Sequence, residues 1–289
     1  MSYHALQKLV VRMLFDEAFV AAIHANANDA LAGADLTEAE RSQLLNVDRR
    51  AWRHDALRRR RTLRTLAEEF KISTTIILAE TRSLASLEKF FSSSFFHQSI
   101  QHRGSLARAF ADFLVDSYQH KQWSTPQIPD LVRLEAAIAG CRRTLAREGA
   151  YEPRELPTNI SDRARVKLAP GHDVASFQAN VIETIQHVER YLFELNLMPA
   201  MALCDDAPRL TGLPAVDAQK KVYLLFSPGA SGISITNLDR AAYLVLYETK
   251  RALEIRSLLA RPGGTKSSAA RAQEVLSEWL EAGALMLIE

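Results

Sequence analysis

The eight histidines of this chain lack the spacing of a metal or catalytic site. No pair forms an HExxH motif, and His97 and His102, five residues apart, fit poorly on one face of a helix. Polar histidines at or near the surface are therefore the expected interpretation. Carboxylates are abundant but scattered over the expected helix faces. Neither residue type predicts metal ligation or acid–base catalysis on this chain.

Nucleotide and nucleophile motifs are also missing from the sequence. There is no GxSxG elbow and no dinucleotide fingerprint. Gly263 to Ser267 is similar to the end of a phosphate-binding loop, but the leading glycine is absent. The segment also falls between two expected helices rather than after a strand, which indicates a connector. An enzyme whose site assembles only in the folded chain stays an open alternative.

Arginines give the chain its sharpest charge feature. A strongly basic helix is expected from Asp48 to Phe70, and it carries four consecutive arginines: Arg58, Arg59, Arg60 and Arg61. Three interpretations stay open, namely contact with nucleic-acid phosphates, contact with an acidic partner surface, and a solvated helix face. Nearby acidic residues offset part of the charge; they are Asp55, Glu68 and Glu69.

The overall charge argues against a dedicated nucleic-acid binder. The formal net charge of the 289 residues is +2, whereas such proteins are usually distinctly basic. The two cysteines, Cys141 and Cys204, have no metal-binding spacing and are expected to be free thiols in a reducing compartment. No signal peptide or membrane-spanning run is present. We therefore expect a soluble, cytoplasmic protein that binds neither nucleic acid nor membrane.

The elements that must position any site suggest an α+β protein that is mostly α. Residues 1–147 read as a helical domain, with a capping box at Thr37 and Glu40 and later helices at Ser105–Tyr118 and Pro129–Leu145. Four phenylalanines around Ser92–Ser94 are expected to be core residues. Residues 148–160 read as a linker and 161–289 as a winged-helix-like domain with a small antiparallel sheet.

The C-terminal domain has the more specific pattern. A strand is expected at 163–168, a helix at 174–195, a strand at 221–227, a turn at 228–232 and a partner strand at 233–235. Three helices and a closing strand at 284–288 follow. Thr236 and Asp239 fit a capping box for the first of these helices, and Gly283 is placed to end the third. A small sheet backed by three helices is a winged-helix outline, which is typical of a binding module.

This C-terminal region resembles the closing domain of partner subunits for multinuclear non-haem iron-dependent oxidative enzymes, which modify ribosomally made peptides. The hairpin, the helices and Trp279-Leu280-Glu281-Ala282-Gly283-Ala284-Leu285 carry the resemblance. Phe110 to Leu114 and Ile128 to Ala137 are similar to the helical domain of the same partner proteins. There an aromatic residue often stands in place of Ile128.

Within that family the chain most resembles the partner subunit of the 3-thiaglutamate pathway. There, the iron enzyme excises the β-carbon from the C-terminal cysteine of a carrier peptide, and the partner subunit holds the leader of that peptide. The resemblance implies a heterodimer with an iron oxidase, no cofactor on this chain and no catalytic residue here. Iron ligands belong to the other subunit in this family.

Peptide addition to a sheet edge also has a physical basis, because main-chain hydrogen bonds form irrespective of sequence while alternate side chains enter pockets. Tyr223, Leu225 and Phe226 are candidate pocket walls, although core packing is favoured for the last two. Arg271 is a candidate contact for acidic leader side chains. The sequence leaves open which edge is free. The full expected peptide-binding set is Lys221, Tyr223, Leu225, Phe226, Ile233, Arg271 and Val275, with Arg58 to Arg61 expected to contact the partner enzyme.

The main rival interpretation is a winged-helix DNA-binding transcriptional regulator with an arginine-rich helical arm. Against it, the expected third helix from Ser268 to Glu281 has one arginine and three glutamates, which makes a poor surface for the phosphate-lined major groove. We therefore expect a non-catalytic, leader-binding accessory subunit.

Overall fold

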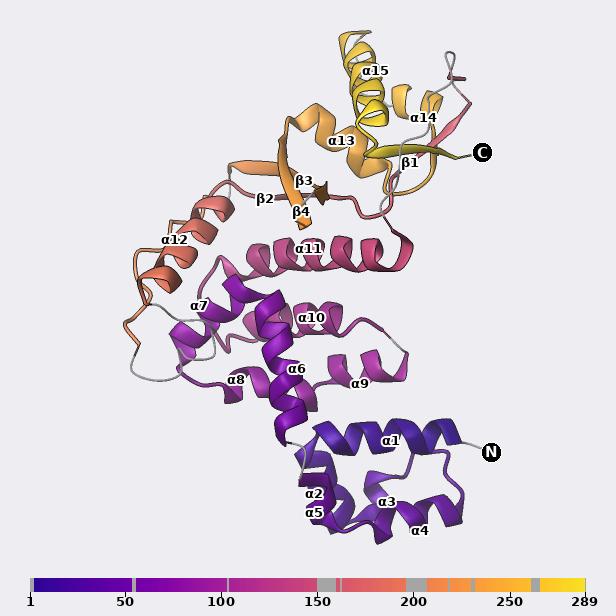
Figure 1. Cartoon of the computed structure of the whole chain (residues 1–289), viewed down its shortest axis with the longest axis vertical. Coiled ribbons are helices and arrows are strands. Elements are labelled where there is room, and N and C mark those ends of the chain that lie inside the picture. Colours follow the sequence, from indigo (N-terminus) through magenta and orange to yellow (C-terminus); the bar gives the residue numbers. More distant parts are fainter. Residues whose placement is uncertain are drawn as a thin grey trace. The chain divides into compact units, whose positions relative to one another are not determined.

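The computed structural model confirms a mostly helical α+β fold (Figure 1). By contact clustering the chain divides into two units, residues 1–132 with 185–213, and residues 133–184 with 214–289. Each unit is described by itself. The structure describes residues 3–53, 56–102, 104–149, 160–161, 163–195, 207–217, 219–229, 232–260 and 266–288.

Among its described residues, all the regular secondary structure of the first unit is helical. Two further helices, α11 (Ile128–Glu148) and α12 (Val181–Glu194), begin in one unit and end in the other. Ahead of them the chain forms α1 (Tyr3–Phe15), α2 (Glu17–Ala25), α3 (Ala27–Ala30), α4 (Glu38–Asn46), α5 (Arg49–Arg53), α6 (Ala56–Glu69), α7 (Lys71–Thr81), α8 (Ala85–Glu88), η1 (Lys89–Ser92), α9 (Ser94–Gln101) and α10 (Leu106–Gln119).

Local sequence signals explain several of these helix starts. The capping box at α4 is confirmed, since Glu40 N donates to Thr37 Oγ1 at 3.3 Å and Thr37 N donates to Glu40 Oε2 at 2.8 Å. Ser105 caps α10 through a hydrogen bond from Arg108 N. The apolar face of α1 packs with α2, where Met13 and Ile23 are each 1% exposed.

Three of the four phenylalanines around Ser92–Ser94 are core residues, as expected, whereas Phe95 is only partly buried. Phe90, Phe91 and Phe96 are at most 1% exposed, and their rings meet edge to face or tilted at centroid distances of 5.4 to 5.7 Å. Phe110 extends the cluster from α10, at 5.1 Å from Phe90. Edge-to-face contacts of this kind add to the free energy of burying the rings.

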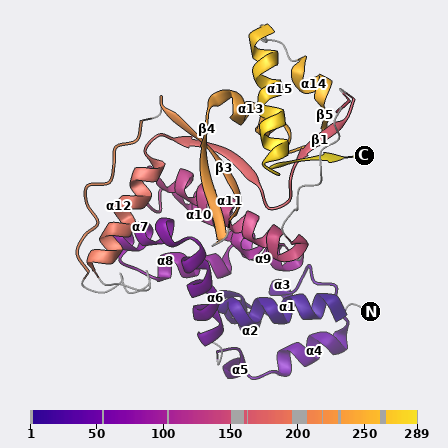
Figure 2. The ribbon, with the colours of Figure 1, turned by 45° about the horizontal axis from the view of Figure 1, so that its top comes forward.

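The second unit contains two three-stranded antiparallel sheets among its described residues, with strand orders β5-β1-β6 and β2-β3-β4. In Figure 2 its strands and C-terminal helices are coloured from pink (β1) through orange (β4 and α13) to yellow (α15). Its elements beyond α11 and α12 are β1 (Arg165–Leu168), β2 (Asp173–Gln178), β3 (Lys221–Gly229), β4 (Gly232–Leu238), α13 (Arg240–Glu248), β5 (Leu253–Glu254), α14 (Ile255–Leu259), α15 (Lys266–Glu281) and β6 (Leu285–Ile288).

One apolar core joins the two sheets of this unit to helices α13, α14 and α15. Val166 on β1, Leu246 on α13 and Val275 on α15 are each 0% exposed within it. Gly283, after α15, has a φ of +73°, which is the left-handed conformation expected of a helix stop. The predicted order of hairpin, three helices and closing strand is therefore present. The winged-helix assignment itself stays a prediction.

Residues 133–148 of α11 belong to this unit and pack against the β2-β3-β4 sheet. Arg133 Nη2 donates to the Ser176 carbonyl at 3.0 Å, and its guanidinium carbon lies 5.3 Å from the centre of the Phe177 ring. Phe177 in turn meets Phe226 edge to face at 6.1 Å. Near the other end of the helix, Leu145 lies against Gly171.

Three expectations about local structure are wrong. Residues 174–178 were expected in a helix but form β2, because each pairs with β3 in an antiparallel register. The strand expected at 233–235 extends over 232–238, so Thr236 pairs with Leu225 and does not cap a helix. Asp239 is the N-cap of α13 instead and accepts from Ala242 N at 2.7 Å.

The expected long basic helix is described as two pieces, α5 and α6. The expected linker lies almost entirely outside the described residues, as do Cys204 and the glycines at 263–264. The contacts divide the chain at other points than the expected boundary at 147, and the domain assignment stays a prediction. Among the described helices, none has the length and apolarity that a membrane crossing requires.

Candidate functional site

The β3-β4 hairpin is the candidate site, because it presents an open strand edge. β3 is the central strand of its sheet and β4 lies outside it (Figure 2). The pairing runs from Tyr223 with Leu238 to Gly229 with Gly232 without interruption. Among the described residues no further strand pairs with the outer edge of β4. Backbone N–H and C=O groups on that edge are therefore available to an added strand.

The two faces of this hairpin have different surroundings. Directly paired residues of antiparallel strands share a face, so Leu225 and Thr236 lie on one face, and Phe226 and Ile235 on the other. The first face is the one that packs with helices α13 to α15, since Leu225 and Leu238 both contact their core. A strand added to β4 would thus have one face toward the helical side of the unit.

Exposure on β4 leaves room for such a strand. The four residues from Ser234 to Asn237 are all exposed, and Ile235, although apolar, is 40% exposed. The opposite edge strand, β2, is less open, because Arg133 from α11 already donates to its Ser176 carbonyl. The structure therefore favours β4 as the free edge, which the sequence alone did not decide.

Charge at the C-terminal end of β4 is locally compensated. Arg271 Nη2 lies 2.8 Å from Asp239 Oδ2, and its Nη1 lies 3.2 Å from Glu274 Oε2. The Ala242 N–H and then the Arg271 guanidinium lower the pKa of Asp239, while the two carboxylates raise the pKa of Arg271. These contacts hold the first turns of α13 and α15 together. Arg271 is therefore already paired, so an acidic leader side chain would have to compete for it.

The other expected peptide contacts fall into two groups. Leu225, Phe226 and Val275 are 0 to 1% exposed and belong to the core, so their side chains line no surface. Core packing was favoured from sequence for the first two but not for Val275. Lys221 is exposed, and Tyr223 and Ile233 are partly exposed. The accessible part of the expected set therefore lies on the hairpin itself.

An aromatic row beside the hairpin was missed at the sequence level. Tyr223 on β3, Tyr243 and Tyr247 stack in order, with centroid distances of 4.7 and 5.5 Å. Tyr247 is 49% exposed, and Lys250 Nζ lies 5.4 Å from the centre of its ring. The i, i+4 spacing of the two tyrosines on α13 was the available signal. The row widens the accessible surface next to β3.

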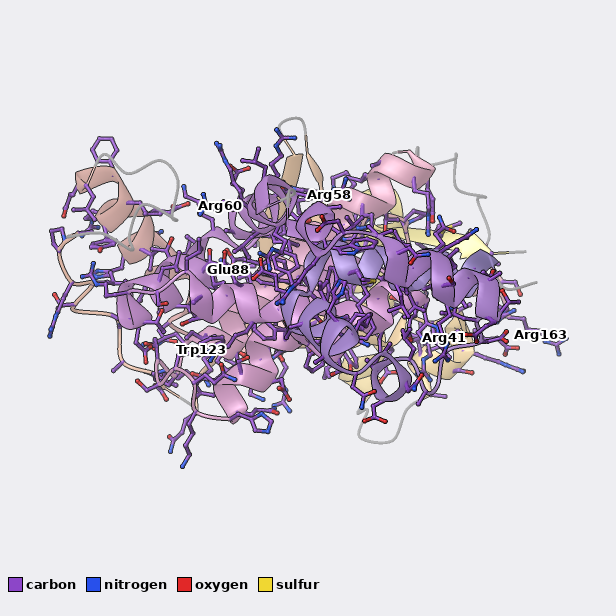
Figure 3. All side chains as sticks on the ribbon, turned by 90° about the horizontal axis from the view of Figure 1, so that it is seen from below. Arg41, Arg58, Arg60, Glu88, Trp123 and Arg163 are labelled. Carbon is purple, nitrogen blue, oxygen red and sulfur yellow. The ribbon has the colours of Figure 1, made fainter. Side chains whose placement is uncertain are left out.

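The expected partner-binding arginines lie on α6. Arg59 faces inward, with Nη2 at 2.5 Å from Glu17 Oε1 and Nη1 at 3.5 Å from the Phe15 carbonyl oxygen. Arg58, Arg60 and Arg61 are exposed, and Arg58 and Arg60 point outward in Figure 3. The four consecutive arginines are thus divided, with one that ties α6 to the start of α2 and three on the surface.

The described residues do not assemble a metal site, since no three histidine, cysteine, aspartate or glutamate side chains gather as one would need. Cys141 is free and buried, and burial raises the pKa of its thiol to about 12, which makes it a poor nucleophile. The chemistry that the described surface offers is strand pairing, aromatic contact and guanidinium pairing.

Comparisons of the chain with protein-family models, curated proteins and solved structures gave no match.

Proposed function

We propose that this chain is a non-catalytic partner subunit that binds the leader of a ribosomally made precursor peptide. It presents the C-terminal cysteine of that peptide to a multinuclear non-haem iron oxidase on another chain, in the cytoplasm. The reaction class is β-carbon excision in 3-thiaglutamate-type natural product biosynthesis, which comes from the resemblance of the sequence. Iron belongs to the oxidase in this proposal, and the present chain supplies binding alone.

The observation that carries the proposal is the open edge of β4. An added strand would fit this edge, because β4 has exposed residues on both faces and helices lie behind one face. In the described part of the chain, no further strand pairs with this edge. The exposed charges of α15 do not suit a DNA groove, because Arg271 is neutralised by Asp239 and Glu274. Peptide addition is thus better supported than the regulator alternative.

Calorimetry tests the proposal with the peptide encoded by a short reading frame beside the gene of this chain. We expect binding, with or without the neighbouring oxidase, and new protection of β4 amides in hydrogen exchange. Absence of binding in both conditions would remove the proposal. Stoichiometric iron in the purified chain alone would contradict the assignment of the chemistry to another subunit.

Adjacent proline substitutions locate the peptide on the strand. Consecutive N–H groups of a strand point to opposite sides, so of Ile235→Pro and Thr236→Pro one removes an outward donor and the other removes a bond to β3. We expect the variant that removes the outward donor to keep the β3-β4 amides protected from hydrogen exchange. It should also weaken peptide binding by about tenfold or more. If both variants bind the peptide like the unmodified chain, β4 is not the site.

A further inference from the structure

The exposed face of α6 combines charge with an apolar residue. Leu57 is 60% exposed, and Arg61 and Arg64 follow it at i+4 and i+7 on the same side of the helix. Arg60 flanks this line at i+3 from Leu57. The opposite side is the buried one, where Leu63 and Leu66 are 0% and 4% exposed. We call Leu57, Arg58, Arg60, Arg61 and Arg64 the α6 face.

The charges on the α6 face work against the helix that carries them. The first turn of α6 has no acidic residue and the last has no basic one, which is the reverse of what the helix dipole favours. Arg58 with Arg61, Arg61 with Arg64, and Arg60 with Arg64 are like-charge neighbours at i+3 or i+4. Helix stability therefore does not account for this arrangement.

Internal ion pairs do not account for the presence of Arg60 and Arg61 on this face either. Arg59 pairs with Glu17, and Arg64 Nε lies 2.8 Å from Glu68 Oε1 with both side chains exposed. In the described part of the chain, no ion pair involves the guanidinium groups of Arg60 or Arg61. These two guanidinium groups and the Leu57 side chain are thus presented to solvent together.

We propose that the α6 face docks a carboxylate-rich protein segment that carries an apolar side chain for Leu57. Guanidinium groups pair with carboxylates in two-pronged hydrogen bonds, and an apolar centre with an arginine rim is typical of protein interfaces. A nucleic-acid backbone would satisfy the arginines but would leave the exposed leucine in contact with phosphates. The inference rests on the proposed function only in that the oxidase would supply the segment.

The probe is a fluorescein-labelled helical peptide with glutamate and leucine at helical spacing, measured by anisotropy on the full chain at low and moderate salt. Arg60→Glu/Arg61→Glu should weaken its binding by about tenfold or more, because charge pairs become repulsive. Leu57→Ser should weaken it by about threefold through lost apolar contact. Glutamates near the start of a helix favour the helix, so the double variant should fold at least as well as the unmodified chain.

The matched control is Arg142→Glu/Arg163→Glu, which makes the same charge change at two other exposed arginines, of which Figure 3 labels Arg163. We expect it to change binding by less than about twofold. If both double variants weaken binding equally, the effect comes from net charge and not from the α6 face, and the proposal is overturned. It is also overturned if the acidic peptide does not bind the unmodified chain at low salt. If duplex DNA binds more tightly than the acidic peptide, and Leu57→Ser does not change DNA binding, the α6 face is a nucleic-acid surface instead.

The experiments on β4 and on the α6 face can fail independently of each other. Arg60→Glu/Arg61→Glu should leave binding of the precursor peptide to β4 unchanged, and the proline variants of β4 should leave binding of the acidic peptide unchanged. Loss of the β4 result alone removes the leader-binding function. Loss of the α6 result alone removes this docking surface.

Discussion

Asp16 is a buried carboxylate that organises the first unit at the scale of a single residue. It is 2% exposed, caps α2 by accepting from Phe19 N at 3.0 Å, and accepts from Ser92 Oγ at 3.1 Å. His97 Nε2 lies 3.2 Å from its Oδ2. Burial alone would raise the pKa of Asp16, but the contacts with His97, Phe19 and Ser92 outweigh it and lower the pKa to about 2.

Replacing this charge should destabilise the protein in a pH-dependent manner. We expect Asp16→Asn, which keeps a capping side chain, to lower the free energy of unfolding at pH 7 by about 2 kcal/mol. Because the pKa is lowered on folding, this stability is present above the ordinary value of 3.8 and is lost as pH falls toward 2. Urea unfolding of both proteins between pH 7 and pH 2 measures it.

An exposed carboxylate provides the control for the Asp16 experiment. Asp112 lies 3.4 Å from Arg108 Nε, and both side chains are largely in solvent. Asp112→Asn should change the unfolding free energy by less than about 0.5 kcal/mol, because exposed pairs contribute little. If the two variants behave alike, or if the Asp16→Asn deficit persists unchanged at pH 2, the charge of Asp16 does not stabilise the fold.

At the scale of elements, patterns that depend on near neighbours were predictable and those that depend on pairing were not. The hydroxyl and carboxylate of Thr37 and Glu40 lie three residues apart, so the cap of α4 could be read directly. Val174, Phe177 and Val181 have helical spacing, yet the first two lie in β2, because its tertiary pairing with β3 outweighs the local pattern.

The candidate site was predictable to the same extent. The alternation of Ile233, Ser234 and Ile235 predicted a half-buried partner strand, but whether its outer side is free depends on β2 and β3 joining in one sheet. Core and pocket residues have the same apolar pattern, so Val275 could not be separated from the exposed contacts without its burial. The arginine run was visible, whereas the inward position of Arg59 was not.

Gly140 inside α11 and Gly171 beside the helix should respond in opposite directions to alanine. Gly171 has a φ of +78°, and a Cβ there would lie 2.6 Å from Leu145 Cδ2, so Gly171→Ala should destabilise by about 1 to 2 kcal/mol. Gly140 is an exposed position inside α11 with open space around its Cβ. Gly140→Ala should stabilise by about 0.5 to 1 kcal/mol. Thermal and urea unfolding check both.

The two results test different statements about α11. A neutral Gly171→Ala would mean that Leu145 can move aside and that the contact between α11 and the turn before β2 is loose. A destabilising Gly140→Ala would contradict the helical, solvent-facing position of residue 140. Only the opposite signs support the packing of α11 on this sheet.

At the scale of the whole molecule, residues 133–148 of α11 belong to the unit of the two sheets. Arg133, Cys141 and Leu145 lie beside residues of β2 or the turn before it. A cut at residue 160, which the composition of the sequence suggested, removes these contacts. A cut at residue 132 keeps them.

Two fragments, 133–289 and 161–289, should therefore differ in stability. Both contain residues 185–213, which are assigned to the other unit, so the two fragments differ only by residues 133–160, which include residues 133–148 of α11. Without α11, Phe177 loses the Arg133 side chain that lies over its ring, and part of an apolar sheet face enters water. We expect 133–289 to unfold cooperatively in urea and 161–289 to be less stable by at least about 2 kcal/mol, or to aggregate. Equal stability of the two fragments would show that the two sheets and α13 to α15 form a folding unit without α11, and that the boundary expected from the sequence is the physical one.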